Sequence, residues 1–226
     1  MNKTGFIFDL DGVIVDTAKY HYLAWKNLAD ELGIEFTIED NENFKGVSRR
    51  RCLEILLEMG GISVSKEQFE AWLVEKNEDY LQYILKMDEN EILPDVKRIL
   101  NYLKEQKIPM ALGSASKNAI PILEKVSLLR YFDAIVDGNS VTKAKPDPEV
   151  FLIAAAKLGV DPLGCVVFED AVAGIEAANS AKMLSIGIGD SEVLSESKFS
   201  FEDFTKIDID FLNRLVLSLQ ERNNKG

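Results

Sequence analysis

The spacing of apolar side chains divides the chain into a helical block near its N-terminus and a longer part of alternating strands and helices. The apolar run at residues 5–8 has the length and composition of a buried strand. Between residues 16 and 88 no strand pattern occurs. In that interval, helical periodicity predicts helices over residues 17–32, 48–59 and 65–87. The pattern therefore predicts a helical insert directly after the first strand.

From residue 95 onward, short apolar runs alternate with helical segments. The runs predict strands at residues 109–113, 134–136, 165–168 and 184–188. Helices are predicted at residues 95–106, 118–126, 147–158, about 170–181 and 208–221. Because such alternation is typical of a parallel sheet covered on both faces, we predict an α/β fold, a doubly wound parallel sheet with a Rossmann-like core and an inserted α-helical cap domain. The core is expected to comprise residues 1–16 and 89–226, and the cap residues 17–88.

Single residues mark several of the helix ends. Gly33 and Gly61 suit C-terminal ends, because glycine readily adopts the left-handed conformation found there. Ser65, followed three residues later by glutamine, resembles a capping box. Asn118 and Asp147 are predicted to cap the helices that follow them.

The charge balance limits the classes of partner. The chain has 38 acidic and 26 basic residues and a net charge of −12, whereas a nucleic acid or an anionic membrane would require a basic face. A small anionic ligand is compatible with this net charge, because a few lysines and a metal can make the electrostatic potential of one cleft positive. Asp9 interrupts the first apolar run too early for a signal peptide, and no run has membrane-spanning length. Two distant cysteines make no disulfide framework. We therefore expect a cytoplasmic monomer without nucleic-acid or membrane partners.

Acidic side chains stand at the ends of two predicted strands. Asp9 and Asp11 are two residues apart after the first strand, so they would point to the same side. Glu169 and Asp170 follow the strand at residues 165–168. Carboxylates this close repel each other unless a cation or a proton shares the site, the alternative being solvated acids at a strand end. Asp9, Glu169 and Asp170 offer the hard oxygen ligands that suit Mg²⁺.

Two further residues suit a phosphate group. Ser114 ends the strand at residues 109–113, where its hydroxyl could hydrogen-bond a phosphate oxygen or simply form a turn. Lys145 precedes Pro146, which keeps it in a loop rather than in the following helix. A loop lysine is usually solvated, but near the acids it would help to hold a transferring phosphoryl group.

In this order, these residues resemble the four motifs of the haloacid dehalogenase-like superfamily. The motifs are Asp9-Leu10-Asp11-Gly12-Val13, Ser114, Lys145-Pro146 and Glu169-Asp170. The resemblance covers essentially the whole chain, and the helical insert is similar to that of the branch with an α-helical cap. Within this branch, the similarity is greatest to sugar-phosphate mutases that interconvert β-glucose 1-phosphate and glucose 6-phosphate. The segments that carry it are residues 16–21, 45–49, 114–118 and 131–135.

The resemblance implies a role for each motif residue. Asp9 would be the nucleophile that becomes an aspartyl phosphate, and Asp11 the general acid and base. Mg²⁺ would be bound by Asp9, Glu169, Asp170 and the backbone carbonyl of Asp11. The residues expected to bind the small-molecule sugar phosphate are Thr17, His21, Trp25, Gly46, Val47, Ser48, Arg49, Lys76, Ser114, Ala115, Lys117, Asn118 and Lys145.

Two cap residues have particular roles by the same resemblance. Arg49 would hold the distal phosphate of the substrate, whereas Arg50 and Arg51 are expected on a solvated helix face. His21 would couple closure of the cap to the chemistry of Asp11. The alternative for His21 is a histidine packed on an apolar helix face.

Other activities stay open at this point. A sugar-phosphate phosphatase has the same motifs and passes the phosphoryl group to water. A phosphonate hydrolase would need a Schiff-base lysine such as Lys45 or Lys76, and a dehalogenase would leave Asp11 without a role. A non-catalytic sugar-phosphate sensor is the alternative outside the enzymes, and the complete set of motif acids argues against it. Val15 and Asp147 depart from the family pattern, which leaves the substrate preference open.

Overall fold

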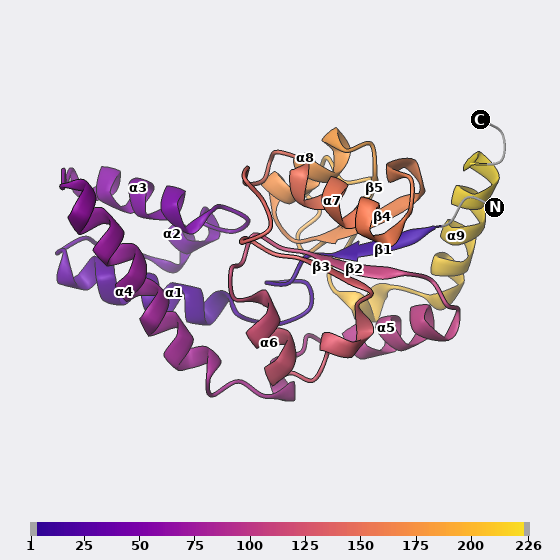
Figure 1. Cartoon of the computed structure of the whole chain (residues 1–226), viewed down its shortest axis with the longest axis horizontal. Helices are drawn as coiled ribbons and strands as arrows, with labels where there is room; N and C mark the ends of the chain where they lie inside the picture. The colour runs from indigo at the N-terminus through magenta and orange to yellow at the C-terminus, as the bar shows by residue number, and fades with distance from the viewer. Residues whose placement is uncertain (1–3, 224–226) are drawn as a thin grey trace.

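The computed structural model describes residues 4–223 and combines a sheet-based core with a helical unit at one end of it (Figure 1). The core contains a six-stranded sheet in which every pairing is parallel. Its strands are β1 (Gly5–Phe8), β2 (Met110–Gly113), β3 (Ala134–Val136), β4 (Cys165–Glu169), β5 (Leu184–Ile188) and β6 (Phe199–Phe201).

Helices cover both faces of the sheet. One face is covered by α5 (Val96–Glu105), α6 (Ala119–Lys125) and α9 (Ile209–Asn223). The other face is covered by α7 (Glu149–Leu158) and α8 (Val172–Ser180). Successive strand residues point to opposite faces, so Phe6 and Phe8 pack in the first layer and Ile7 in the second. Burial on both faces explains the continuous apolar runs of the strands, and the predicted fold class is confirmed.

The strand order places the two acidic motifs side by side. The order is β3-β2-β1-β4-β5-β6, so the chain runs outward from β1 to β3 and then returns to β4 on the other side of β1. Phe8 of β1 lies opposite Phe168 of β4, and the residues that follow them are Asp9 and Glu169. Sheets of this kind bind ligands at such a switch in strand order, outside the carboxyl ends of the strands.

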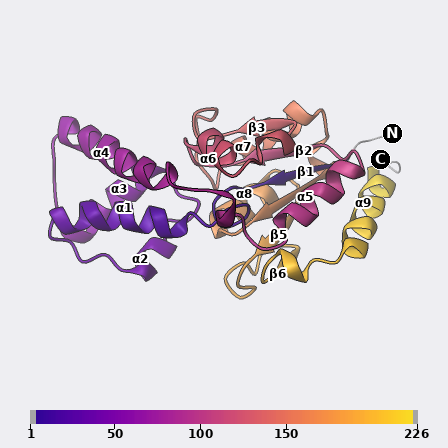
Figure 2. The same ribbon diagram turned by 90° about the horizontal axis from the view of Figure 1, so that it is seen from below.

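The helical unit is inserted between β1 and α5 and has its own apolar core (Figure 2). It consists of α1 (Ala18–Glu31), α2 (Ile38–Glu42), α3 (Arg49–Gly60) and α4 (Lys66–Ile84). Trp25, Phe36 and Leu53 are among the side chains buried inside it. The two connecting segments are joined by backbone hydrogen bonds, from Asp16 N to Glu91 O at 2.8 Å and from Leu93 N to Ile14 O at 3.1 Å.

The structure corrects several details of the predicted elements. The helix α2 was not predicted because five residues are too short to show a helical period, and the strand β6 because a serine interrupts its apolar residues at the edge of the sheet. The helix predicted to reach residue 87 ends at Ile84. Asn118 stands at the N-cap of α6, but its side chain bonds Asn77 instead of the helix. The helix α7 begins at Glu149, one residue later than predicted, so Pro148 and not Asp147 is its N-cap, although Asp147 Oδ1 still accepts a hydrogen bond from Glu149 N at 3.0 Å.

The other predicted helix ends agree with the structure. Gly33 and Gly61 have φ values of 68° and 62°, the left-handed conformation expected after a helix. The Ser65 hydroxyl accepts a hydrogen bond from the backbone N–H of Gln68. Among the helices within residues 4–223, none has the length and apolar character needed to cross a membrane.

Candidate active site

An acidic cluster lies at the carboxyl ends of β1 and β4. Asp9, Glu169 and Asp170 each place one carboxylate oxygen within 4.8 Å of the others. Asp9 is held beside β4 by a hydrogen bond from its backbone N–H to Phe168 O at 3.0 Å. Asp9 is 6% exposed and Glu169 is fully buried. The fold thus concentrates three acids where water can stabilise their charges only weakly.

Lys145 lies against this cluster. Its Nζ is 2.6 Å from Asp9 Oδ1 and 2.8 Å from Glu169 Oε2, and the lysine is almost fully buried. Burial lowers the pKa of Lys145, but the charges of Asp9 and Glu169 outweigh this effect and raise it. The lysine is therefore charged, and it compensates one carboxylate of the cluster.

The pKa values of the carboxyl groups reflect the negative charge that Lys145 leaves uncompensated. Burial raises the pKa of Asp9 to about 7, and the charges of Glu169 and Asp11 add to the effect of burial. Burial and the charges of Glu169 and Asp9 raise the pKa of Asp170 well above its ordinary value. A divalent cation would relieve this repulsion, and the ligands are the hard oxygens that Mg²⁺ requires. The residues present therefore fit a magnesium ion.

A tight turn after β1 brings Asp11 to the same site. Gly12 has a φ of 76°, and a Cβ there would lie 2.1 Å from Asp170 Oδ2, so glycine is required on both counts. The Thr17 hydroxyl donates a hydrogen bond to Asp11 Oδ1, and His21 Nε2 lies 3.8 Å from the same oxygen. Burial works to raise the pKa of Asp11, but the contacts with His21 and Thr17 lower it. Asp11 is thus ionised beside its imidazole neighbour.

His21 connects Asp11 to the helical unit. Its ring stacks on Tyr80 with centroids 4.2 Å apart, and its Nδ1 lies 3.1 Å from Lys76 Nζ. Lys76 is buried between the rings of Trp25 and Tyr80, 4.7 and 4.8 Å from their centroids. Burial lowers the pKa of Lys76 to about 7, with a further contribution from the charge of Arg49. Burial also lowers the pKa of His21, and the charge of Lys76 adds to that effect.

Ser114 forms the third side of the site, at the end of β2. It is buried, and its Oγ accepts a hydrogen bond from Ser116 N at 3.0 Å. This contact folds the loop that carries Lys117 and Asn118 over the strand end. Asn118 Nδ2 donates to Asn77 Oδ1 of α4 at 2.9 Å, which links the loop to the helical unit.

The helical unit contributes the loop before α3. Gly46 has a φ of 70°, and a Cβ there would lie 3.1 Å from Ala171 Cβ, so this loop closely approaches the core. Lys45 Nζ is 3.8 Å from Asp170 Oδ2. Arg49, at the start of α3, has a pKa lowered by burial, and within the described part of the chain it forms no ion pair.

The two neighbouring arginines differ from Arg49. Arg50 pairs with Glu70 at 2.5 Å. Arg51 pairs with Glu54 and Glu58, both at 3.0 Å. Both side chains are about half exposed, as predicted for a solvated helix face.

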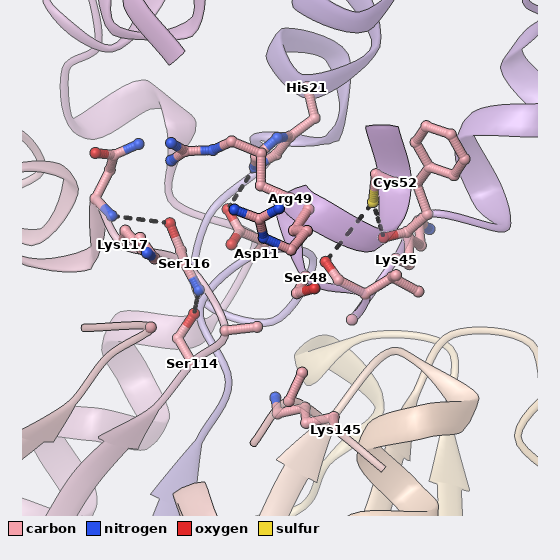
Figure 3. A pocket seen from close by; sticks show the side chains of 18 of the residues that line it. Asp11, His21, Lys45, Ser48, Arg49, Cys52, Ser114, Ser116, Lys117 and Lys145 are labelled. Carbon is pink, nitrogen blue, oxygen red and sulfur yellow. Dashed lines mark hydrogen bonds and ion pairs between the residues drawn. The ribbon is translucent and has the colours of Figure 1, made fainter. Parts of the chain in front are cut away.

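These groups surround one cavity of about 690 Å³ between the core and the helical unit. Arg49 approaches it from the helical unit and Lys145 from a loop of the core (Figure 3). The predicted site residues that line it are Asp9, Asp11, His21, Trp25, Gly46, Val47, Ser48, Arg49, Lys76, Ser114, Ala115, Lys117, Asn118, Lys145 and Asp170. Thr17 and Glu169 lie behind its wall, where they contact Asp11 and Lys145.

Several residues of the site were not among those predicted, including Ser116, Asn77 and Tyr80. Ser116 and Asn77 line the cavity, and Tyr80 stacks on His21. Ser116 could have been found from its place two residues after Ser114. Tyr80 lies one helical turn after Lys76, so it shares a helix face with that residue. The sequence offers no comparable signal for Asn77.

Comparison with known proteins identifies the class. Residues 3–182 match the model of the haloacid dehalogenase-like hydrolase family, and the chain belongs to this family. It is 44% identical to beta-phosphoglucomutase of Bacillus subtilis over 188 residues, 82% of this chain and 83% of that protein. The crystal structure of beta-phosphoglucomutase from Clostridium difficile superposes with a TM-score of 0.91 at 39% identity, over 96% of this chain and 98% of the other.

A second kind of relative has the name of a phosphatase. The chain is 36% identical to a phosphorylated carbohydrates phosphatase of Thermotoga maritima, over 77% of this chain and 80% of that protein. It is also 34% identical to a fructose-1-phosphate phosphatase of Escherichia coli, over 81% of this chain and 95% of that protein. The predicted family resemblance is confirmed, and both a mutase and phosphatases stand among the relatives.

Proposed function

We propose that this protein is a Mg²⁺-dependent phosphomutase that interconverts β-glucose 1-phosphate and glucose 6-phosphate. The observation that carries the proposal is that cations face one cavity from both sides, from the core and from the helical unit. Lys145 stands beside Asp9 on the core, and Arg49 enters from the helical unit without a carboxylate partner among the described residues. A sugar that carries a phosphate at each end needs two such positions. The similarity to the Bacillus subtilis mutase supports the same assignment.

In the proposed reaction, Asp9 is the nucleophile and Asp11 moves the proton. A carboxylate oxygen of Asp9 forms a bond to phosphorus as the bond from phosphorus to its donor oxygen breaks, which gives an aspartyl phosphate. The phosphoryl group then passes to a hydroxyl of the sugar monophosphate, whose proton Asp11 accepts. The resulting glucose 1,6-bisphosphate reorients and returns its other phosphoryl group to Asp9, while Asp11 protonates the released oxygen.

The other residues hold the charges in place. Lys145 and Ser114 would bind the transferring phosphoryl group, and Arg49 the distal phosphate through its planar guanidinium group. Asp9, Glu169, Asp170 and the Asp11 carbonyl would hold Mg²⁺, which supplies neutralisation of the charge on the transferring group when bound. Residues 17–88 would act as a cap domain that excludes water while the sugar turns.

The competing function is a sugar-phosphate phosphatase, and the phosphatase relatives are the observation in its favour. Phosphorus NMR separates the two. β-Glucose 1-phosphate is incubated with Mg²⁺ and a trace of glucose 1,6-bisphosphate as primer. The proposal predicts glucose 6-phosphate as the main product, whereas accumulation of inorganic phosphate at a matching rate would establish the phosphatase. We place the enzyme in the cytoplasm as a monomer. Size-exclusion chromatography with light scattering can test the monomeric state.

A further inference from the structure

A second cavity, of about 490 Å³, lies at the opposite end of the sheet from the acidic cluster. It opens where β1, β2 and β3 begin and where α5 ends. Its lining includes Thr4, Lys104, Lys107, Arg130, Tyr131 and Asp133.

This cavity is basic in a strongly acidic protein. Lys104, Lys107 and Arg130 line it together with one acid, Asp133, whereas the whole chain has a net charge of −12. Asp133 is already engaged, because its Oδ2 accepts a hydrogen bond from Met110 N at 2.9 Å. Within residues 4–223, none of the three cations has a carboxylate oxygen within 4.0 Å. With three cations and one acid in its lining, the cavity has two positive charges in excess.

Two of these cations are gathered about one aromatic ring. Lys104 Nζ lies 4.9 Å from the centroid of Tyr131, and Arg130 Cζ lies 5.7 Å from the same centroid. Lys104 Nζ is also held by the backbone carbonyl of Arg130, at 3.0 Å. Both cations stand beside the same ring and neither has a carboxylate within 4.0 Å among the described residues, so an anion bound between them would be attracted by both.

The wall of the cavity also contains a buried hydroxyl. Thr4 is 4% exposed, and its Oγ1 has no hydrogen-bond partner in the described part of the chain. A buried hydroxyl without a partner destabilises a protein, and rotation of the Thr4 side chain toward the cavity would let a ligand supply the missing hydrogen bond. The position of Lys104 in the last turn of α5 is favourable for the helix dipole. That explanation covers neither Arg130 nor Thr4.

We propose that this cavity binds a phosphate dianion, free or esterified, at a site separate from the catalytic cavity. The two excess positive charges match a dianion, and the Thr4 hydroxyl supplies a neutral hydrogen bond to it. The volume leaves room for a small group esterified to the phosphate. The inference does not depend on the proposed mutase activity.

The test is a titration of the ¹⁵N-labelled protein with inorganic phosphate, and in parallel with glycerol 3-phosphate, at constant ionic strength. The backbone amides of Ile108 and Met110 report on this cavity, and that of Ser116 reports on the catalytic one. We expect saturable shifts at Ile108 and Met110 whose dissociation constant differs from that at Ser116. Tighter binding of glycerol 3-phosphate would assign an esterified ligand, and equal binding a free phosphate.

A charge-matched pair of double variants isolates the cavity. Lys104→Gln with Lys107→Gln removes two of its cations. Lys157→Gln with Lys182→Gln is the control, because Lys157 Nζ also donates to a backbone carbonyl and Lys182, like Lys107, has a positive φ. We expect at least tenfold weaker binding in the first pair and little change in the second.

Thr4→Val removes the hydroxyl with little change in shape. It should weaken binding several-fold without lowering the stability of the phosphate-free protein. Absence of saturable shifts at Ile108 and Met110 in the wild type, or equal weakening by the control pair, would overturn the proposal.

Discussion

The ammonium nitrogen of Lys145 lies 2.6 Å from Oδ1 of Asp9, although 136 positions separate the two residues in the chain. The contact places a positive charge against the carboxylate that is proposed to receive the phosphoryl group. Lys145 also contacts Glu169, so one lysine is shared by two acids while Asp170 stays beside them. The balance of charge in this cluster leads to the first prediction.

Removal of one acid of the cluster should abolish Mg²⁺ binding. Asp170→Asn keeps the shape of the side chain but removes a charged ligand. We expect its Mg²⁺ affinity, measured by calorimetry, to fall at least tenfold and its turnover to resemble that of the wild type in EDTA. Asp147→Asn is the control, because Asp147 pairs with Lys143 outside the cluster. Full turnover of the wild type in EDTA would exclude a metal from the reaction.

Substitutions of Asp9 and Asp11 should have different effects on phosphoenzyme formation and on turnover. Asp9→Ala removes the atom that is phosphorylated, so neither a phosphoenzyme nor turnover is expected. Asp11→Asn retains that atom but loses the proton carrier, and isomerisation should fall by roughly 10²–10⁴-fold. Mass spectrometry after exposure to acetyl phosphate detects the phosphoenzyme. A phosphoenzyme in folded Asp9→Ala would show that the nucleophile is another residue.

Arg49 should distinguish the mutase from the phosphatase. Arg49→Ala removes the proposed partner of the distal phosphate, so isomerisation of β-glucose 1-phosphate should fall by orders of magnitude. Hydrolysis of acetyl phosphate, which has no distal phosphate, should change much less. The matched control is Arg51→Ala, because Arg51 pairs with Glu54 and Glu58 and does not line the cavity. Equal losses in both reactions for Arg49→Ala would contradict the mutase assignment.

Two glycines with similar backbone conformation should respond differently to alanine. Gly12 and Gly33 have φ values of 76° and 68°, but only at Gly12 would a Cβ collide with Asp170. Gly33→Ala, with open space around it, should lose about 1 kcal/mol of unfolding free energy and keep its activity. Gly12→Ala should lose more stability and also its Mg²⁺ affinity. Denaturant unfolding and calorimetry on both variants test this, and equal effects would refute the role of Gly12 in placing Asp170.

Lys76 should make stability depend on pH above neutrality. Burial lowers its folded pKa to about 7, against about 10.4 in an unfolded chain. Between these values the unfolded state binds more protons, so the unfolding free energy should rise with pH from about 7 to about 10. Lys76→Met should abolish that rise and stabilise the protein most at pH 7 and below. The control is Lys125→Met, since Lys125 is exposed. A rise that persists in Lys76→Met would contradict the prediction.

The sequence by itself determined the fold class and the acids of the site. Five of the six strands contain short apolar runs, and the acidic motifs directly follow two of these runs, so both features are local in the chain. Parallel strands bring their carboxyl ends to one edge of the sheet. The convergence of Asp9 with Glu169 therefore followed from the motif positions together with the alternation of strands and helices.

The tertiary structure alone decided which of several equivalent side chains enter the cavity. Arg49 and Arg51 are identical in type and two positions apart on α3, but Arg49 lines the cavity whereas Arg51 pairs with Glu54 and Glu58 outside it. The contact of His21 with Lys76 and Tyr80 depends in the same way on how α1 packs against α4. The contacts of His21 join positions more than 50 residues apart. They depend on helix packing, which local periodicity does not encode.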